Sequence, residues 1–195
     1  MNTELEHRIQ QLSSPKILDL GCGDPFTFFN LFQLCNFTYT GVDKRAEHVI
    51  CRKPNGKVAN YWIRNKYQIG INGAENSRYL DADEFSKFFR FHFETDILNY
   101  LSLTSDKHDV IILSNILHFF PKEIAKQTYK HCLSRLTDDG VIYVSVFPDG
   151  YLYGIPDMAE PYNPRDLHEL KLEVHVLWAN EASIDEMYQF IGRAT

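Results

Sequence analysis

Short apolar runs alternate along the chain with amphipathic stretches, and this alternation predicts strands and helices in turn. The runs at 16–20, 38–42 and 109–113 are typical of strands, and the last is continuous enough to be covered on both faces. A helix is predicted to begin at Pro121 because apolar residues follow it at helical spacing. These residues are Ile124, Ala125, Tyr129, Cys132, Leu133 and Leu136. Asp138-Asp139-Gly140 is expected to close this helix before a strand at 141–147.

The other predicted elements complete an alternating pattern. After the first strand comes a glycine turn, and Asp24 and Pro25 then suit the N-cap and first position of a helix. Further strands are expected at 91–95, 173–178 and 186–191, the last two antiparallel, with helices near 81–89 and 165–170. Strands that alternate with helices indicate an α/β fold, with a doubly wound, mostly parallel sheet that has helices on both faces.

The length of 195 residues suits one domain, 1–195, with a poorly periodic insertion at 44–80 after the second strand. The chain is 44% hydrophobic, yet no apolar run approaches the roughly 18 residues of a membrane helix. The N-terminal segment has no signal-peptide pattern, and the four cysteines form no C-x-x-C pair. We therefore expect a cytoplasmic protein with reduced thiols, without a membrane partner and without a metal site.

Charge is unevenly distributed along the chain. The net charge is −6, but Lys44–Lys66 holds seven bases and one acid, so the remainder holds 13 bases and 25 acids. Such a segment is either a solvated basic loop or a surface for a polyanion such as RNA.

The glycine turn carries the candidate chemistry. Gly21 and Gly23 let a ligand approach the backbone, as a nucleotide cofactor requires. Asp19 and Asp24 nearby would repel a pyrophosphate, whereas they would attract the sulfonium and ammonium of S-adenosylmethionine. Asp43, at the end of the second strand, is placed to accept hydrogen bonds from both hydroxyls of a ribose. The negative charge beside the glycine turn thus favours S-adenosylmethionine over a cofactor that contains a pyrophosphate.

At this point the chain resembles the class I methyltransferase family. The resemblance is carried by Ile17-Leu18-Asp19-Leu20-Gly21-Cys22-Gly23, Gly41-Val42-Asp43, Glu94-Thr95-Asp96-Ile97 and the segment 109–118. It implies a seven-stranded sheet with an antiparallel last strand. The chain departs from the family at Pro25, where a third glycine is common, and in the length of the insertion.

The resemblance also implies a cofactor site. Asp19, Gly21, Cys22 and Gly23 would face the methionine part of S-adenosylmethionine. Asp43 would bind the ribose, with Lys44 beside it. Asp96 and Ile97 would bind the adenine, and Ser114 the methionyl end.

Substrate contacts are predicted for His118, which follows the fourth strand at the expected mouth of the site, and for Tyr151, Tyr153 and Tyr162 in a proline-rich loop. No residue is assigned as catalytic, because direct displacement from a sulfonium requires mainly alignment and exclusion of water.

Three functions are compatible with these features. The first is a methyltransferase that acts on a small-molecule acceptor. The second is an RNA methyltransferase that uses the basic segment 44–66, and the third is a non-catalytic S-adenosylmethionine-binding module. The sequence names neither the acceptor nor the oligomeric state.

Overall fold

The computed structural model describes residues 2–23, 28, 31–32, 34–45, 66–69, 78–81, 86–147, 163–180 and 187–194. No helix in these ranges combines the length and the apolarity needed to cross a membrane.

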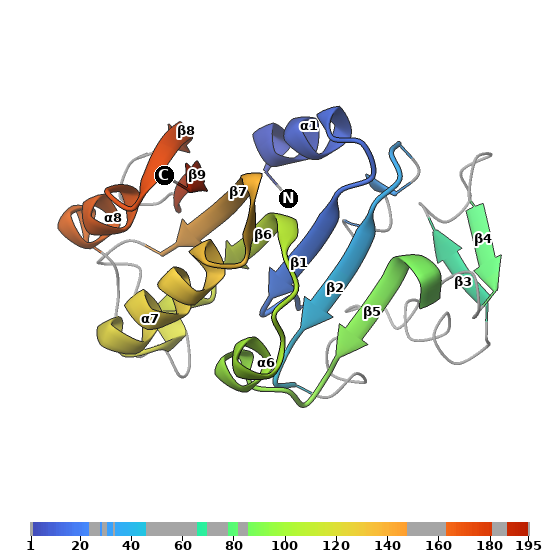
Figure 1. Cartoon of the computed structure of the whole chain (residues 1–195), viewed down its shortest axis with the longest axis horizontal. Helices are drawn as coiled ribbons and strands as arrows, with labels where there is room; N and C mark the ends of the chain where they lie inside the picture. The colour runs from blue at the N-terminus through green and yellow to red at the C-terminus, as the bar shows by residue number, and fades with distance from the viewer. Residues whose placement is uncertain are drawn as a thin grey trace.

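A seven-stranded sheet forms the centre of the molecule, in the order β5-β2-β1-β6-β7-β9-β8 (Figure 1). Its strands are β1 (Lys16–Leu20), β2 (Thr38–Val42), β5 (Phe89–His92), β6 (His108–Ser114), β7 (Leu136–Val146), β8 (Val174–Asn180) and β9 (Tyr188–Ala194). The strands β5, β2, β1, β6 and β7 pair in parallel, and β9 is antiparallel to both β7 and β8. The predicted fold class is confirmed, including the antiparallel last strand, and the run 109–113 lies in β6, the central strand of the sheet.

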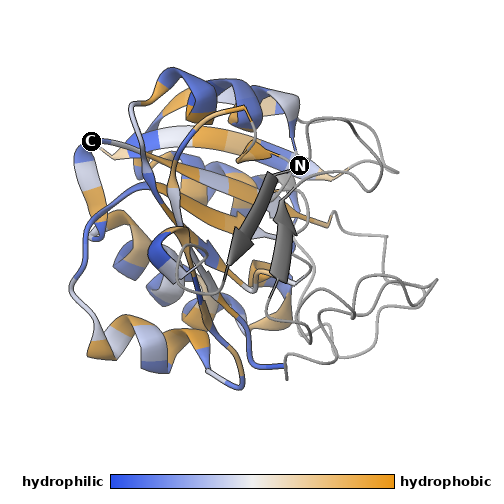
Figure 2. Ribbon diagram, turned by 90° about the vertical axis from the view of Figure 1, so that its right-hand side faces the viewer, coloured by the Kyte–Doolittle hydropathy of each residue, from blue (hydrophilic) through white to orange (hydrophobic). Residues whose placement is uncertain are grey.

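Helices cover both faces of this sheet. Residues of α6 (Ile97–Leu103), α7 (Lys122–Leu133) and α8 (Pro164–Lys171) pack into one apolar cluster with alternate residues of the central strands. The helix α1 (Thr3–Gln11) packs through Leu5 and Ile9 into a second cluster, which also holds Phe28, Leu31 and Phe32. Figure 2 shows mainly hydrophobic strands between helices that carry both hydrophilic and hydrophobic residues. Each strand of the sheet's centre is thus buried on both sides.

Several predicted boundaries were wrong. The strand expected at 91–95 is β5, Phe89–His92, because the backbone turns at Glu94, where φ is +54°. The helix that follows Pro121 ends at Leu133, and Leu136 already begins β7, so Asp138-Asp139-Gly140 lies within a strand instead of closing the helix. The predicted N-cap Asp24 and the helix start at Pro25 lie outside the described residues.

The insertion 44–80 was expected to be poorly periodic, but it contributes two strands. These are β3 (Lys66–Ile69) and β4 (Arg78–Asp81), which pair antiparallel in a separate sheet. The predicted bounds of the helix near 81–89 are therefore wrong at both ends, since Asp81 ends β4 and Phe89 begins β5. Residues 86–88 within this range are helical.

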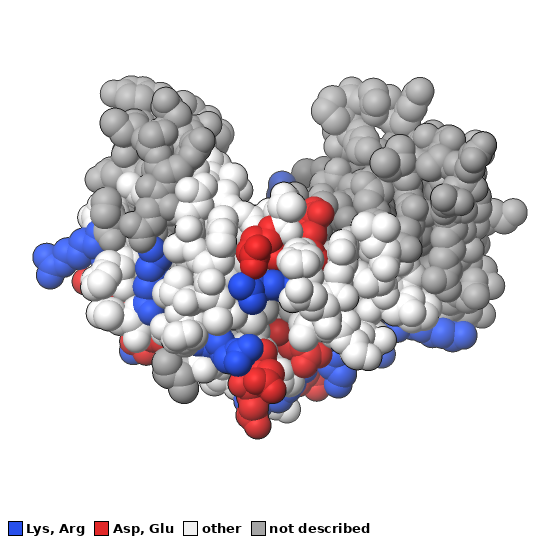
Figure 3. All heavy atoms as spheres, turned by 90° about the horizontal axis from the view of Figure 1, so that it is seen from above, with Lys and Arg blue, Asp and Glu red and all other residues white. Residues whose placement is uncertain are grey.

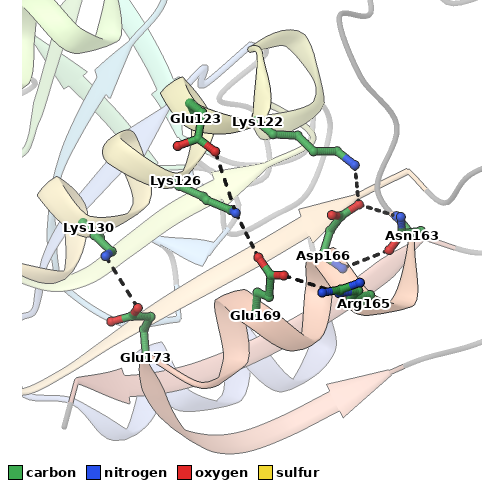
Figure 4. A network of polar contacts seen from close by, with 9 residues as sticks. All are labelled: Lys122, Glu123, Lys126, Lys130, Asn163, Arg165, Asp166, Glu169 and Glu173. Carbon is green, nitrogen blue, oxygen red and sulfur yellow. Dashed lines mark hydrogen bonds and ion pairs between the residues drawn. The ribbon is translucent and has the colours of Figure 1, made fainter.

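A row of ion pairs joins α8 to α7 (Figure 4). The Nζ atom of Lys122 lies 2.6 Å from Asp166 Oδ2, and that of Lys126 lies 2.9 Å from Glu169 Oε2. Asp166 also forms a capping box with Asn163 at the start of α8. These pairs link the two helices at the surface, while Leu167 and Leu170 of α8 pack with Ala125 and Tyr129 of α7 in the apolar cluster.

Candidate functional site

The principal pocket lies at the carboxyl ends of the parallel strands, where α/β sheets bind their ligands. It has a volume of about 350 Å³. Five of the residues predicted to bind a cofactor line it, namely Gly21, Asp43, Lys44, Asp96 and Ile97. The chain turns out of β1 through Gly21 at φ +74° and Gly23 at φ +52°, conformations that favour glycine.

Asp43 lies at the pocket wall with almost no exposed surface, and each of its two carboxylate oxygens accepts two hydrogen bonds. Its Oδ1 accepts from the backbone N–H of Arg45 at 2.9 Å and from Arg45 Nε at 3.0 Å. Its Oδ2 accepts from the Gly23 N–H at 3.1 Å and from Arg45 Nη2 at 3.0 Å. Burial alone would raise the pKa of Asp43, but the hydrogen bonds from Arg45 and Gly23 outweigh burial and lower it.

Asp19 lies behind the glycine turn, where it is buried and does not line the pocket. Its Oδ2 accepts a hydrogen bond of 2.7 Å from the hydroxyl of Tyr39 on β2. Burial raises the pKa of Asp19 to about 7, the bond from Tyr39 opposes this rise, and the charge of Asp43 adds to it. Asp19 is therefore a carboxyl group that gains or loses its charge near neutral pH.

Cys22 and Gly23 also lie outside the pocket lining. Burial, with the neighbouring charges of Asp19 and Asp43, raises the pKa of the Cys22 thiol. Such a thiol is a poor nucleophile. The amide of Gly23 serves to hold Asp43.

Asp96 connects the pocket to α6. Its Oδ1 accepts from the amides of Leu98 and Asn99 at 2.9 and 3.2 Å, which makes Asp96 the N-cap of this helix. Its Oδ2 accepts no hydrogen bond from the described residues. One carboxylate oxygen is thus left for a ligand.

The end of β6 places Asn115 in the pocket lining, whereas the predicted Ser114 is not part of it. Ser114 Oγ lies 3.1 Å from Ser145 Oγ on β7, and Ser145 Oγ donates to Asn115 Oδ1 at 3.0 Å. Asn115 has a φ of +55°, which turns the chain away from the strand. The network of these three side chains fixes the pocket wall next to Gly21.

His118 lies inside the protein and not at the pocket mouth, where it was expected. Its side chain is fully buried, and neither ring nitrogen has a hydrogen-bond partner in the described part of the chain. The rings of Phe119 and Phe147 lie 4.5 and 4.9 Å from it, centroid to centroid. Burial lowers its pKa to about 4. A direct contact with substrate does not follow from this position.

The other predicted substrate residues, Tyr151, Tyr153 and Tyr162, lie outside the described residues. So does most of the basic segment, 46–65. Their predicted roles stay predictions.

Five pocket residues were missed by sequence reasoning, namely Arg45, Asn115, Ile116, Phe119 and Phe120. Only their position in the sequence could have indicated these five residues, because each lies within two residues of a predicted site residue. Ile116, Phe119 and Phe120 are half-buried and give the pocket an apolar part of its lining.

Solved structures resemble this chain over its whole length. TehB from Haemophilus influenzae matches with a TM-score of 0.66 at 15% identity, over 100% of this chain and 63% of that one. The 1,6-didemethyltoxoflavin-N1-methyltransferase of Burkholderia thailandensis, with bound 1,6-didemethyltoxoflavin and S-adenosylhomocysteine, matches at 0.62 and 14% identity, over 98% and 76%. The magnesium protoporphyrin IX methyltransferase of Synechocystis PCC 6803, with bound S-adenosylhomocysteine, matches at 0.60 and 14% identity, over 98% and 83%.

No protein-family model matches the sequence, and no curated protein matches it either. The chain spans a little under two thirds of the Haemophilus influenzae structure. At 14–15% identity, the similarity to these three structures shows a shared fold.

Proposed function

We propose that this chain, which has the fold of the class I S-adenosylmethionine-dependent methyltransferases, binds S-adenosylmethionine and transfers its methyl group to a small-molecule acceptor. The observation that carries the proposal is the pocket at the carboxyl ends of β1, β2 and β6, in which the Gly21 turn, Asp43 and Asp96 meet. The volume of about 350 Å³ lies in the range of small-molecule sites.

The pocket residues fit the cofactor once Arg45 moves. Asp43 would accept the ribose hydroxyls, and the free Oδ2 of Asp96 would accept from the adenine end. The four N–H groups on Asp43 occupy every acceptor position of its carboxylate, so the guanidinium of Arg45 must leave. Arg45 can do so because half of its side chain is exposed to solvent.

The chain's own residues have the task of binding and alignment. When bound, S-adenosylmethionine would supply an activated methyl group that an acceptor atom takes by direct displacement. Ile116, Phe119 and Phe120 offer an apolar wall against which a small organic acceptor can be held and water excluded. Asp19, behind the turn, adds negative charge near a cationic ligand when it is ionised.

Two observations favour a small acceptor over RNA. Two of the similar structures are, by their descriptions, a magnesium protoporphyrin IX methyltransferase and a 1,6-didemethyltoxoflavin methyltransferase, so this fold serves small substrates in those proteins. The chain also carries a net charge of −6, which opposes a long polyanion.

The test is calorimetry with S-adenosylmethionine, S-adenosylhomocysteine and NADH, followed by a screen of metabolites and short RNAs for formation of S-adenosylhomocysteine. We expect binding of the first two ligands, no binding of NADH, and turnover with a small molecule. Tight binding of NADH alone would refute the cofactor, and turnover with RNA only would refute the acceptor. Cofactor binding without turnover on any acceptor would support the binding-module alternative.

A further inference from the structure

A second hollow lies at the opposite edge of the main sheet from the cofactor pocket. It has a volume of about 260 Å³ and is formed at the amino ends of β1, β2, β5 and β6. In Figure 1 the arrowheads of β1, β2 and β5 point downward, so this edge is at the top. Because β1 has five residues, the two edges are about 17 Å apart. The hollow is therefore separate from the cofactor pocket.

The charged residues that line this hollow are mostly basic. They are Lys16, Lys87, Arg90 and Lys107, with Asp106 as the one acid among the described lining residues. The surplus is unusual in a chain with 26 acids and 20 bases. Like charges gathered in one hollow repel one another unless an anion lies between them.

None of these four bases forms an ion pair with an acid of the described residues. The bases on α7 behave differently, since Lys122, Lys126 and Lys130 each lie within 4.0 Å of a carboxylate (Figure 4). Within the described part of the chain, the lysines of α7 are thus paired with carboxylates, whereas Lys16, Lys87 and Arg90 are not.

His108 supplies an independent observation. It lines the hollow, its side chain is only 6% exposed, and its buried Nδ1 has no hydrogen-bond partner among the described residues. A buried polar nitrogen without a partner costs folding free energy, so a ligand that bonds to it recovers that cost. Lys107 is held in place beside it, because its Nζ donates to the carbonyls of Ser134 and Leu136, both at 3.0 Å. A third Nζ proton remains free.

We propose that this hollow binds the phosphate group of a small phosphorylated ligand, through Lys16, Lys87, Arg90 and Lys107, with His108 as a further hydrogen-bond donor. The arginine and lysine residues that line one hollow offer several donors, which match the several acceptor oxygens of a phosphate. The hydroxyls of Thr38 and Thr40, which also line the hollow, can donate to the same group. The proposal does not depend on the function of the cofactor pocket.

The size and surroundings of the hollow indicate a single phosphate group. Its volume is below that of pockets for drug-sized ligands, which leaves room for a phosphate and a small attached body. Figure 3 views the molecule from above Figure 1, and on its coloured part basic and acidic side chains alternate in small groups. The described part of this face has no continuous basic track of the kind that a nucleic-acid strand follows.

The experiment titrates the protein with inorganic phosphate, by calorimetry and by NMR of the His108 ring. The test variant is Lys87→Gln/Arg90→Gln, and the matched control is Lys130→Gln/Arg165→Gln, which removes the same charge from exposed side chains of α7 and α8. We expect saturable binding by wild type and control, at least tenfold weaker binding by the test variant, and a rise of the His108 pKa on binding in the wild type.

Equal phosphate affinity in wild type and test variant, or an unchanged His108 titration at saturation, would overturn the proposal. A further arm uses a short single-stranded RNA with and without a 5′-phosphate. Preference for the 5′-phosphorylated RNA over the unphosphorylated one supports recognition of a terminal phosphate monoester. Binding of both RNAs with equal affinity, with a salt dependence of several phosphates, would replace the single-phosphate site by a polyanion surface.

Discussion

The guanidinium of Arg45 holds both carboxylate oxygens of Asp43, with Nε 3.0 Å from Oδ1 and Nη2 3.0 Å from Oδ2. This fork-shaped contact occupies the acceptor positions that a ribose would use in the proposed cofactor site. Arg45 and the cofactor are therefore competitors for one carboxylate.

Replacing Arg45 by alanine should tighten the binding of S-adenosylmethionine, whereas Asp43→Ala should weaken it tenfold or more. Because the Arg45 side chain is half exposed to solvent, the gain from Arg45→Ala should be about twofold to tenfold. Calorimetry on both variants measures these changes. Arg45→Lys, which keeps the charge but loses the fork, should fall between wild type and alanine. Weaker binding by Arg45→Ala would mean that Arg45 contacts the cofactor directly.

Cofactor affinity should also depend on pH through Asp19. Burial raises the pKa of this carboxyl to about 7, so the fraction that is ionised grows through neutral pH. A cationic ligand favours the ionised form, and S-adenosylmethionine should therefore bind more tightly at about pH 8 than at about pH 6.

Tyr39→Phe tests this assignment, because the hydrogen bond from the Tyr39 hydroxyl lowers the pKa of Asp19. Its loss should move the rise in affinity to higher pH, and Asp19→Asn should abolish the rise. Calorimetric titrations across this pH range are the measurement. A pH profile that is the same in wild type and Tyr39→Phe would rule out Asp19 as the titrating group.

Strand positions were predictable from the sequence because the strands are short runs rich in apolar and β-branched residues. The first and second strands, Lys16–Leu20 and Thr38–Val42, lie where they were expected, and so Gly21 and Asp43 fall at the pocket. Element ends were less predictable. Leu136 continues the helical spacing of α7 but lies in β7, because apolar periodicity does not record where the backbone changes conformation.

Contacts between side chains were not predictable from spacing. Arg45 was one of seven bases in a charged segment, and nothing in the sequence distinguishes a guanidinium on Asp43 from one in solvent. The burial of His118 depends in the same way on tertiary packing against Phe119 and Phe147.

Gly21→Ala should destabilise the protein and impair cofactor binding. The φ of +74° is unfavourable for alanine, and an added Cβ would lie 2.6 Å from Ile116 Cδ1. We expect a loss of about 1–3 kcal/mol in the free energy of unfolding, measured by urea denaturation. The double variant Gly21→Ala/Ile116→Ala removes the collision but keeps the backbone strain. If it regains full stability compared with Ile116→Ala, the collision and not the backbone accounts for the loss.

The buried imidazole of His118 should make the protein less stable in acid. Burial lowers its pKa from 6.5 to about 4, so between these values the unfolded chain binds a proton that the folded protein does not. The resulting loss of stability begins as the pH falls below about 6.5 and reaches on the order of 3 kcal/mol near pH 4. Protonation of Asp19 acts in the opposite direction, because its raised pKa makes the folded state the better proton acceptor between pH 3.8 and about 7.

The two effects separate in a comparison of wild type with His118→Leu, which fills the apolar site without a titrating group. Urea denaturation at several pH values gives the free energy of unfolding of each protein. The contribution of Asp19 is common to both and cancels in the difference. The stability of His118→Leu relative to wild type should therefore increase as the pH falls from about 6.5 to about 4, and level off below that range. A difference that stays constant across this range would show that His118 is protonated equally readily in the folded and unfolded states, and that its burial has no electrostatic cost.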